Sequence, residues 1–140
     1  MPVDPSLSGR TFPASAAYEV TEERLAAFAT ATGTPRTAGG PAPATFPIVV
    51  AFDAMQVLMS AADVGIELQH VVHGQQRFVH RRPVRVGDLL TAALTVTGLR
   101  HLGGADIIST SSAITDAAGE LVCTADATLV HKAPHDEAGT

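Results

Sequence analysis

Residues 44–62 read ATFPIVVAFDAMQVLMSAA, and this stretch decides the expected fold. Phe46 and Val50 recur on one face at helical spacing, and apolar residues occupy most of the other faces as well. A helix that is apolar nearly all round is buried in a protein. Because Pro47 is tolerated only in the first turn of a helix, we expect this buried helix to begin near Thr45 or Phe46.

The chain after this helix changes character. It becomes rich in Val, Ile, Thr and Leu, with alternation of apolar and polar residues, and Gly-containing turns separate the rich segments. This pattern predicts long antiparallel strands over residues His70–Pro83, Asp88–Leu102, Ala105–Thr115 and Glu120–Lys132.

The chain before the buried helix predicts one edge strand and one short helix. Phe12, Tyr18 and Val20 lie within residues 11–20, which could pair at a sheet edge. Thr21 is a suitable N-cap because two glutamates follow it, and carboxylates in a first turn complement the helix dipole. Gly33 is a natural stop for that helix, and a Gly- and Pro-rich loop runs on to residue 43.

These elements predict an α+β fold in which an antiparallel sheet of about five strands wraps round one long buried helix. With 140 residues the chain is the size of one domain. We expect a lead-in over residues 1–10, a single domain over 11–132 and a flexible tail over 133–140. Such a sheet keeps one open edge, and pairing with a second subunit is a common way to cover it.

Composition narrows the function classes. The net charge of −5, the absence of Trp and an aromatic content of 4% argue against nucleic-acid binding. The N-terminus shows no secretion signal, and the buried helix is interrupted by Asp53 and Gln56 and is too short for a membrane span. The single cysteine, Cys123, lies in a strand-like segment and is expected to be buried. These features favour a cytoplasmic protein.

No standard motif for a metal, a phosphate or a nucleophile is present. The six histidines include no pair with a compelling ligand spacing, and His70 and His73 would lie on opposite faces of a strand. We therefore expect neither a metal site nor a cofactor.

Two segments carry a resemblance to a known family. PAPATFPIVVAFDAM (Pro41–Met55) and HGQQRFVHRRPVRVGDLL (His73–Leu90) resemble the N-terminal-type domain of MaoC-like dehydratases, and the turn DAAGEL (Asp116–Leu121) also fits. In pattern the chain is similar to the subunits that pair in mycobacterial-type (3R)-hydroxyacyl-acyl-carrier-protein dehydratases. The resemblance spans about residues 11–132 and implies the hot-dog fold. It also implies elimination of water from a 3-hydroxyacyl thioester to give a trans-2-enoyl thioester.

The catalytic members of that family carry an Asp and a His, about five residues apart, on the loop before the buried helix. The chemistry needs one group to remove an α-proton and another to assist the leaving hydroxyl. The matching loop here has Thr34 after Gly33, no His between Thr30 and Gln69, and no carboxylate between Ala31 and Phe52. The resemblance thus implies a non-catalytic subunit that lines an acyl tunnel and pairs with an active MaoC-like subunit, as a heterodimer or a dimer of heterodimers.

The resemblance also suggests binding residues. Residues expected at the substrate are Phe46, Met55, His73, Gly74 and Gln75. His80, Arg81, Arg82 and Arg85 concentrate positive charge in an acidic chain, and the three arginines could attract the phosphate of coenzyme A or an acyl carrier protein. Plain core positions and a solvated strand end are the structural alternatives.

Two other functions stay open. A self-sufficient homodimeric dehydratase or thioesterase would use Asp53 with His73 or His80 across the interface, although a buried lone carboxylate needs a partner. An acyl-thioester-binding protein without chemistry would need no catalytic residue at all. Fatty-acid and polyketide synthesis are both compatible with the first reading.

Overall fold

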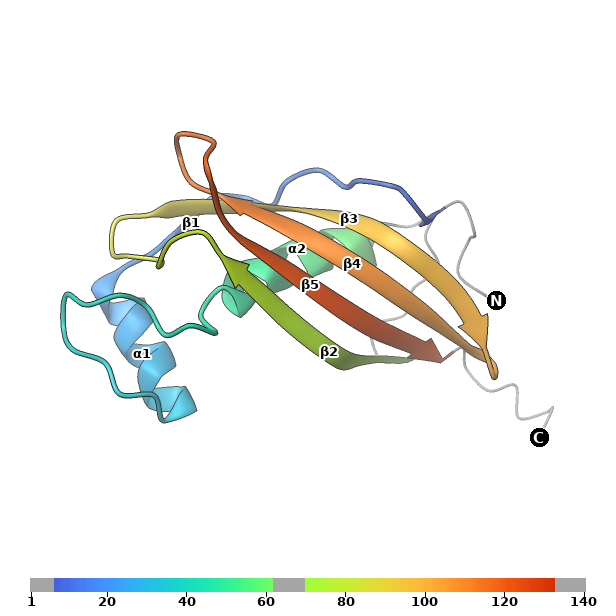
Figure 1. The fold of residues 1–140 in the computed structure, drawn as a ribbon, viewed down its shortest axis with the longest axis horizontal. Coiled ribbons are helices and arrows are strands. Elements are labelled where there is room, and N and C mark those ends of the chain that lie inside the picture. Colours follow the sequence, from blue (N-terminus) through green and yellow to red (C-terminus); the bar gives the residue numbers. More distant parts are fainter. Residues whose placement is uncertain (1–6, 62–69, 133–140) are drawn as a thin grey trace.

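The computed structural model describes residues 7–61 and 70–132 and contains two helices and a five-stranded sheet (Figure 1). In chain order the elements are β1 (Tyr18–Glu19), α1 (Glu22–Thr32), α2 (Ile48–Ser60), β2 (Val71–His80), β3 (Leu89–Leu102), β4 (Ala105–Thr115) and β5 (Leu121–Lys132). The predicted α+β fold with four long strands after a buried helix is confirmed, with boundaries shifted by one to three residues.

All strands pair antiparallel, in the order β1-β3-β4-β5-β2. The β3–β4 hairpin closes through Gly103 and Gly104, which have φ values of +59° and +81°. Both central residues of this two-residue turn therefore occupy the left-handed region, which L side chains disfavour and glycine tolerates. This backbone conformation explains why glycine occupies both positions of the turn that the sequence predicts.

Local caps fix α1. The Thr21 hydroxyl accepts a hydrogen bond from the Arg24 N–H at 3.1 Å, as expected of an N-cap. At the other end Gly33 has a φ of +68°, and the Thr34 N–H donates to the Ala29 carbonyl at 2.9 Å. Leu25 and Ala29 are buried, so one stripe of α1 faces the core.

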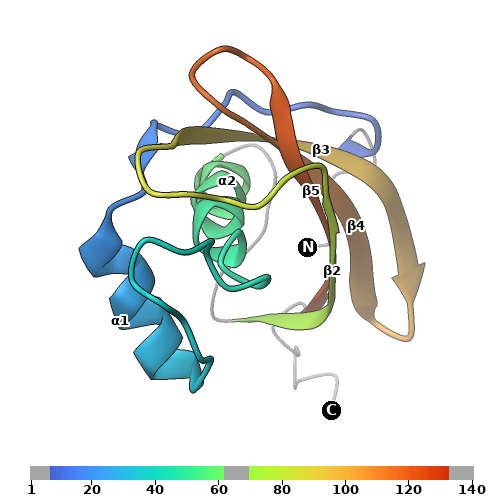
Figure 2. The ribbon, with the colours of Figure 1, turned by 60° about the vertical axis from the view of Figure 1, so that its left-hand side comes forward.

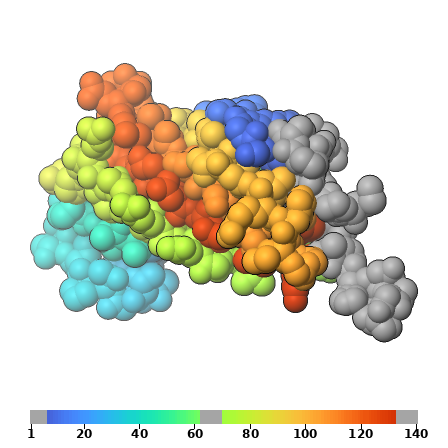
Figure 3. All heavy atoms as spheres, turned by 45° about the vertical axis from the view of Figure 1, so that its right-hand side comes forward, coloured from blue at the N-terminus to red at the C-terminus, as the bar shows by residue number. Residues whose placement is uncertain are grey.

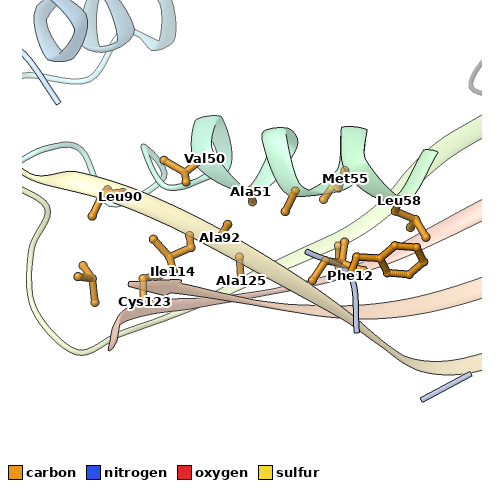
Figure 4. Packing of buried hydrophobic residues seen from close by; sticks show 14 of the residues in the cluster. Phe12, Val50, Ala51, Met55, Leu58, Leu90, Ala92, Ile114, Cys123 and Ala125 are labelled. Atoms are coloured by element: carbon orange, nitrogen blue, oxygen red, sulfur yellow. The ribbon is translucent and has the colours of Figure 1, made fainter. Parts of the chain in front are cut away.

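The curled sheet wraps round α2 (Figure 2). The helix begins at Ile48, two to three residues later than expected, because residues 44–47 form a turn that ends at Pro47. Its residues Ala51 and Ala54 are fully buried, and the facing strands offer Ala92 and Ala125 (Figure 4). Small side chains on both surfaces let helix and sheet approach closely. Larger side chains from the same cluster fill the remaining space: Val50, Met55, Leu58, Leu90, Leu94, Ile108 and Ile114.

The two sheet edges differ. Residues 9–15 follow β3 through hydrogen bonds that include the Phe12 N–H to the Leu94 carbonyl and the Ser15 N–H to the Ala92 carbonyl. The expected N-terminal edge segment is thus present, although its regular part is limited to β1. Leu7 is 1% exposed, so the folded part includes residues assigned to the lead-in from sequence. At the opposite edge, no strand in the described ranges pairs with the outer side of β2.

The predicted tail, residues 133–140, lies outside the described residues. In residues 7–61 and 70–132 neither helix has the length and apolar content needed to span a membrane.

Candidate functional site

An apolar cavity of about 290 Å³ lies where α2 meets the inner side of β2. Met55 and Leu129 form its buried part, at 3% and 1% exposure, whereas Phe52 is 48% exposed. The cavity therefore opens toward solvent beside the free edge of the sheet. Its lining comprises Phe52, Met55, Gln56, Met59, Val71, His73 and Leu129.

A β-bulge at Gly74 shapes this cavity. His73 pairs with Leu129 and Gln75 pairs with Thr128, so the register shifts between the two β2 residues. His73 points inward, where its ring meets the ring of Phe52 edge-on at a centroid distance of 6.0 Å. A bulge reverses the alternation of faces along a strand. Gln75 consequently lies on the outer face, away from the cavity.

The outer face carries a separate polar hollow of about 370 Å³. Figure 3 shows β2, β5, β4 and β3 in this order across this surface. Gln75 and Arg77 line the hollow together with short hydroxyl side chains and Asp126. Of the five residues expected at the substrate, the structure brings only Met55 and His73 to the apolar cavity.

Phe46 takes a structural place instead. It is 1% exposed, and its ring packs edge-on against the rings of Phe28 and Tyr18 at centroid distances of 5.3 and 6.0 Å. This contact holds α1 and β1 against the segment that leads into α2. Phe46 and Met55 are nine residues apart in sequence and lie in different parts of the core.

Within one chain, the alternative catalytic residues lie apart from one another. Asp53 is exposed on α2, so the expectation of a buried carboxylate is corrected: the inward face of the helix is taken by residues 50, 51, 54, 55 and 58. His80 forms a hydrogen bond through Nε2 with the Ala44 carbonyl at 2.8 Å, which ties the end of β2 to the segment before α2. In the described parts of the chain, no hydrogen bond or ion pair joins Asp53 to His73 or His80.

An ion pair ties the loop before α2 to α1. Arg36 donates two hydrogen bonds to the Glu22 carboxylate, at 2.6 and 2.9 Å, and a third to the Gly40 carbonyl. The Gly39 N–H donates to the same carboxylate at 3.1 Å. The Arg36 guanidinium lowers the pKa of Glu22 to about 2. The loop is thereby fastened to the first turn of α1 by side chains that stay charged at neutral pH.

The three arginines of the predicted patch differ in exposure and in ion pairing. Arg82 is bound to two carboxylates, Asp88 at 2.9 Å and Asp116 at 3.2 Å. Burial works to raise the pKa of Asp88, but hydrogen bonds from Arg82 and from the Arg85 N–H outweigh it, so this pKa lies below its usual value. Arg81 and Arg85 are exposed. Arg82 thus links two loops at this end of the sheet, the β2–β3 loop and the β4–β5 turn, and its charge is neutralised within the chain.

A polar cluster with two buried members, Asp106 and His131, lies on the inner face at the other end of the sheet. His101, Asp106 and His131 are register neighbours on β3, β4 and β5. The Asp106 carboxylate is hydrogen-bonded to Nδ1 of His101 and, at 3.3 Å, to Nδ1 of His131. His131 is 1% exposed and meets the His70 ring edge-on. Sequence reasoning missed this cluster, because only strand register brings residues so far apart in the chain together.

Cys123 is buried, as expected, and burial raises the pKa of its thiol to about 11. In the described ranges, no group of three or more His, Cys, Asp or Glu side chains is arranged to hold a metal ion.

Comparison with known proteins assigns the chain to a protein family. Residues 6–125 match the family model of the FAS1-like, dehydratase domain region. A UPF0336 protein of Clavibacter michiganensis is 43% identical, over 93% of this chain and 96% of its own length, and one of Streptomyces coelicolor is 36% identical, over 97% and 99%.

Comparison with solved structures gives the same family of folds. The C-terminally truncated HadBC (3R-hydroxyacyl-ACP dehydratase) complex from Mycobacterium tuberculosis contains a chain that is 28% identical, with a TM-score of 0.77 over 89% of this chain and 96% of that one. A MaoC-like dehydratase, at 24% identity, shares the fold with a TM-score of 0.75. The hot-dog fold expected from the resemblance is confirmed. The chain therefore belongs to the FAS1-like dehydratase domain family, with the fold of the MaoC-like hot-dog dehydratases.

Proposed function

We propose that this chain is the non-catalytic, tunnel-lining subunit of a heteromeric (3R)-hydroxyacyl-thioester dehydratase. Its partner would be a catalytic MaoC-like hot-dog subunit that carries the Asp and His needed for elimination. The pair would form a heterodimer or a dimer of heterodimers in the cytoplasm. It would convert 3-hydroxyacyl groups to trans-2-enoyl thioesters during fatty-acid or polyketide synthesis.

The observation that carries this proposal is the loop before α2. Dehydration needs a base and an acid near the thioester. This loop instead holds Arg36 in a bidentate pair with Glu22, and an arginine stays protonated throughout the physiological range. Asp53, His73 and His80 do not form a joined set in the described residues. Among the described residues, the lining of the apolar cavity holds a single imidazole, that of His73. The hydrogen-bonded Asp106–His131 pair lies outside that lining, further along β5 and away from the loop before α2.

The free edge of β2 supports a partner at that side. Val72 and Val79 on this strand are 63% and 44% exposed, and unpaired strand edges recruit further strands. The cavity opens beside this same edge, so a second sheet docked there would cover its mouth. The similarity to a chain of the HadBC complex agrees with such pairing.

The thioester would be carried by acyl carrier protein or coenzyme A. Arg81 and Arg85 are exposed at the end of β2 and are the residues we assign to the phosphate or to an acidic carrier surface. Arg82 would support them by holding the neighbouring loops through Asp88 and Asp116.

The test is reconstitution. The purified chain alone should hydrate crotonyl-coenzyme A no faster than a buffer blank, and it should co-purify with a co-expressed MaoC-like subunit from the same genome. The complex should then hydrate the enoyl thioester, and replacing the partner's catalytic Asp with Asn should abolish turnover. A chain that turns over substrate by itself would contradict the proposal.

The same assay separates the other functions. If the chain acts alone through Asp53, Asp53→Asn removes the activity, and thioester hydrolysis rather than hydration would identify a thioesterase. If it only binds acyl thioesters, it retains enoyl-coenzyme A in equilibrium dialysis but gains no activity with any MaoC-like partner.

A further inference from the structure

Beyond the lining of the apolar cavity, the inner face of the sheet becomes polar. Leu129 belongs to the cavity lining, and His131 lies two residues further along the same inward face of β5. Val71, also in the lining, is the register partner of His131 on β2. Two residues of strand correspond to roughly 7 Å. The apolar floor therefore gives way within that distance to the Asp106–His131 pair.

The change from apolar to polar side chains along β5 limits the length of an acyl tail that the cavity can bind. His131 and Asp106 are 1% and 3% exposed and are hydrogen-bonded to each other. An acyl tail pushed beyond Leu129 would press methylenes against a buried carboxylate–imidazole pair and disturb its hydrogen bonds, which is costly. Burial of an apolar tail is therefore favourable only as far as Leu129, the last apolar side chain on this face.

Volume gives a second, independent limit. An apolar cavity of about 150 Å³ holds one benzene molecule, with six carbons, so the 290 Å³ cavity has room for roughly ten to twelve carbons. Met59, in the last turn of α2, and Met55 line this space. Methionine is flexible and fills irregular gaps, so the length of these side chains sets how much of the space remains.

We infer that this cavity selects medium-chain acyl groups, with a tail limit of about ten to twelve carbons set by Met59 and by the Asp106–His131 pair beyond the lining. The inference rests on the proposed function, because the tail reaches the cavity from a thioester processed by the partner subunit. It names the substrate class that this subunit contributes to the complex.

The experiment measures kcat/KM of the reconstituted complex on trans-2-enoyl-coenzyme A substrates from four to eighteen carbons. Each methylene that enters the cavity should raise kcat/KM by roughly fourfold, and the rise should stop at about ten to twelve tail carbons. Met59→Ala should move this break point to longer chains by about two carbons, and Met59→Phe should move it to shorter chains. The two variants act in opposite directions, so a fold defect in one does not remove the test.

Leu89→Ala is the control. This leucine is also large and is 43% exposed, but it lies at the start of β3, far along the sheet from the cavity. Its replacement should leave the break point in place. A wild-type profile that keeps rising to eighteen carbons, or a break point that neither Met59 variant moves, overturns the inference alone. Absence of turnover at every chain length, despite a formed complex, instead overturns the proposed function.

Discussion

Arg36 forms a bidentate ion pair with Glu22, which lies fourteen residues earlier in the sequence. Nη1 is 2.6 Å from Oε2, and Nη2 is 2.9 Å from Oε1. The guanidinium is nearly buried and the carboxylate is about half exposed. This bidentate pair closes the loop that leads toward α2 onto the first turn of α1. The connection lies in the loop where the family resemblance leads one to expect acid–base residues.

The first prediction concerns acid pH. The folded-state pKa of Glu22 is about 2, below its ordinary value of 4.5. The pair therefore stabilises the folded state fully above about pH 4.5, and this stabilisation is lost as the pH falls toward 2. In Glu22→Gln that part of the pH dependence should be missing. Thermal unfolding between pH 2 and pH 6 measures it, and Glu23→Gln, an exposed neighbour in the same turn, should keep the wild-type slope.

The second prediction concerns the buried cluster. Asp106→Ala should cost about 3 kcal/mol of unfolding free energy, because it removes the side chain that is hydrogen-bonded to both imidazoles and leaves the buried His131 without this partner. His101→Ala should cost about 1 kcal/mol or less, since the His101 side chain is 48% exposed. Urea unfolding gives both values. Equal losses for the two variants would show that the cluster is not organised round Asp106.

The third prediction uses two glycines with different backbones. Gly104→Ala should destabilise the fold by roughly 1–2 kcal/mol, because φ is +81° in the β3–β4 turn. Gly74→Ala should be neutral or stabilise by about 0.5 kcal/mol: its φ is not in the left-handed region, and an added Cβ meets nothing nearer than 3.5 Å. Both values come from chemical denaturation, and a large loss for Gly74→Ala would mean that the bulge requires glycine.

The fourth prediction concerns Cys123. A thiol with a pKa of about 11 remains protonated at neutral pH, and the thiolate is the reactive form. The native protein should therefore resist Ellman's reagent at pH 7.5, whereas the protein in 6 M guanidinium should react at once. Rapid labelling under native conditions would place the thiol in a more accessible setting than the one described here.

Much of the fold follows from local sequence. Thr21 and Gly33 bound α1 because capping is decided by neighbouring residues. The four long strands follow from β-branched runs between turn residues. The N-terminal segment was harder to define, because its hydrogen bonds go to β3, about eighty residues away.

The site was predicted less completely, for a geometric reason. His73 and Gln75 are two residues apart and would share one face of a regular strand. The bulge at Gly74 sends them to opposite faces, so only His73 reaches the cavity. Met59 and Leu129 were missed because a cavity depends on how helix and sheet pack. The ion pair of Arg36 and the Asp106 cluster likewise depend on distances that no local pattern encodes.

The two edges of the sheet differ in strand pairing, and this difference has a consequence for assembly. Residues 9–15 run along β3, whereas the outer side of β2 is unpaired within the described chain. Two molecules that joined through the outer side of β2 would present no further β2 edge. Growth by strand addition at β2 would therefore stop after a single step.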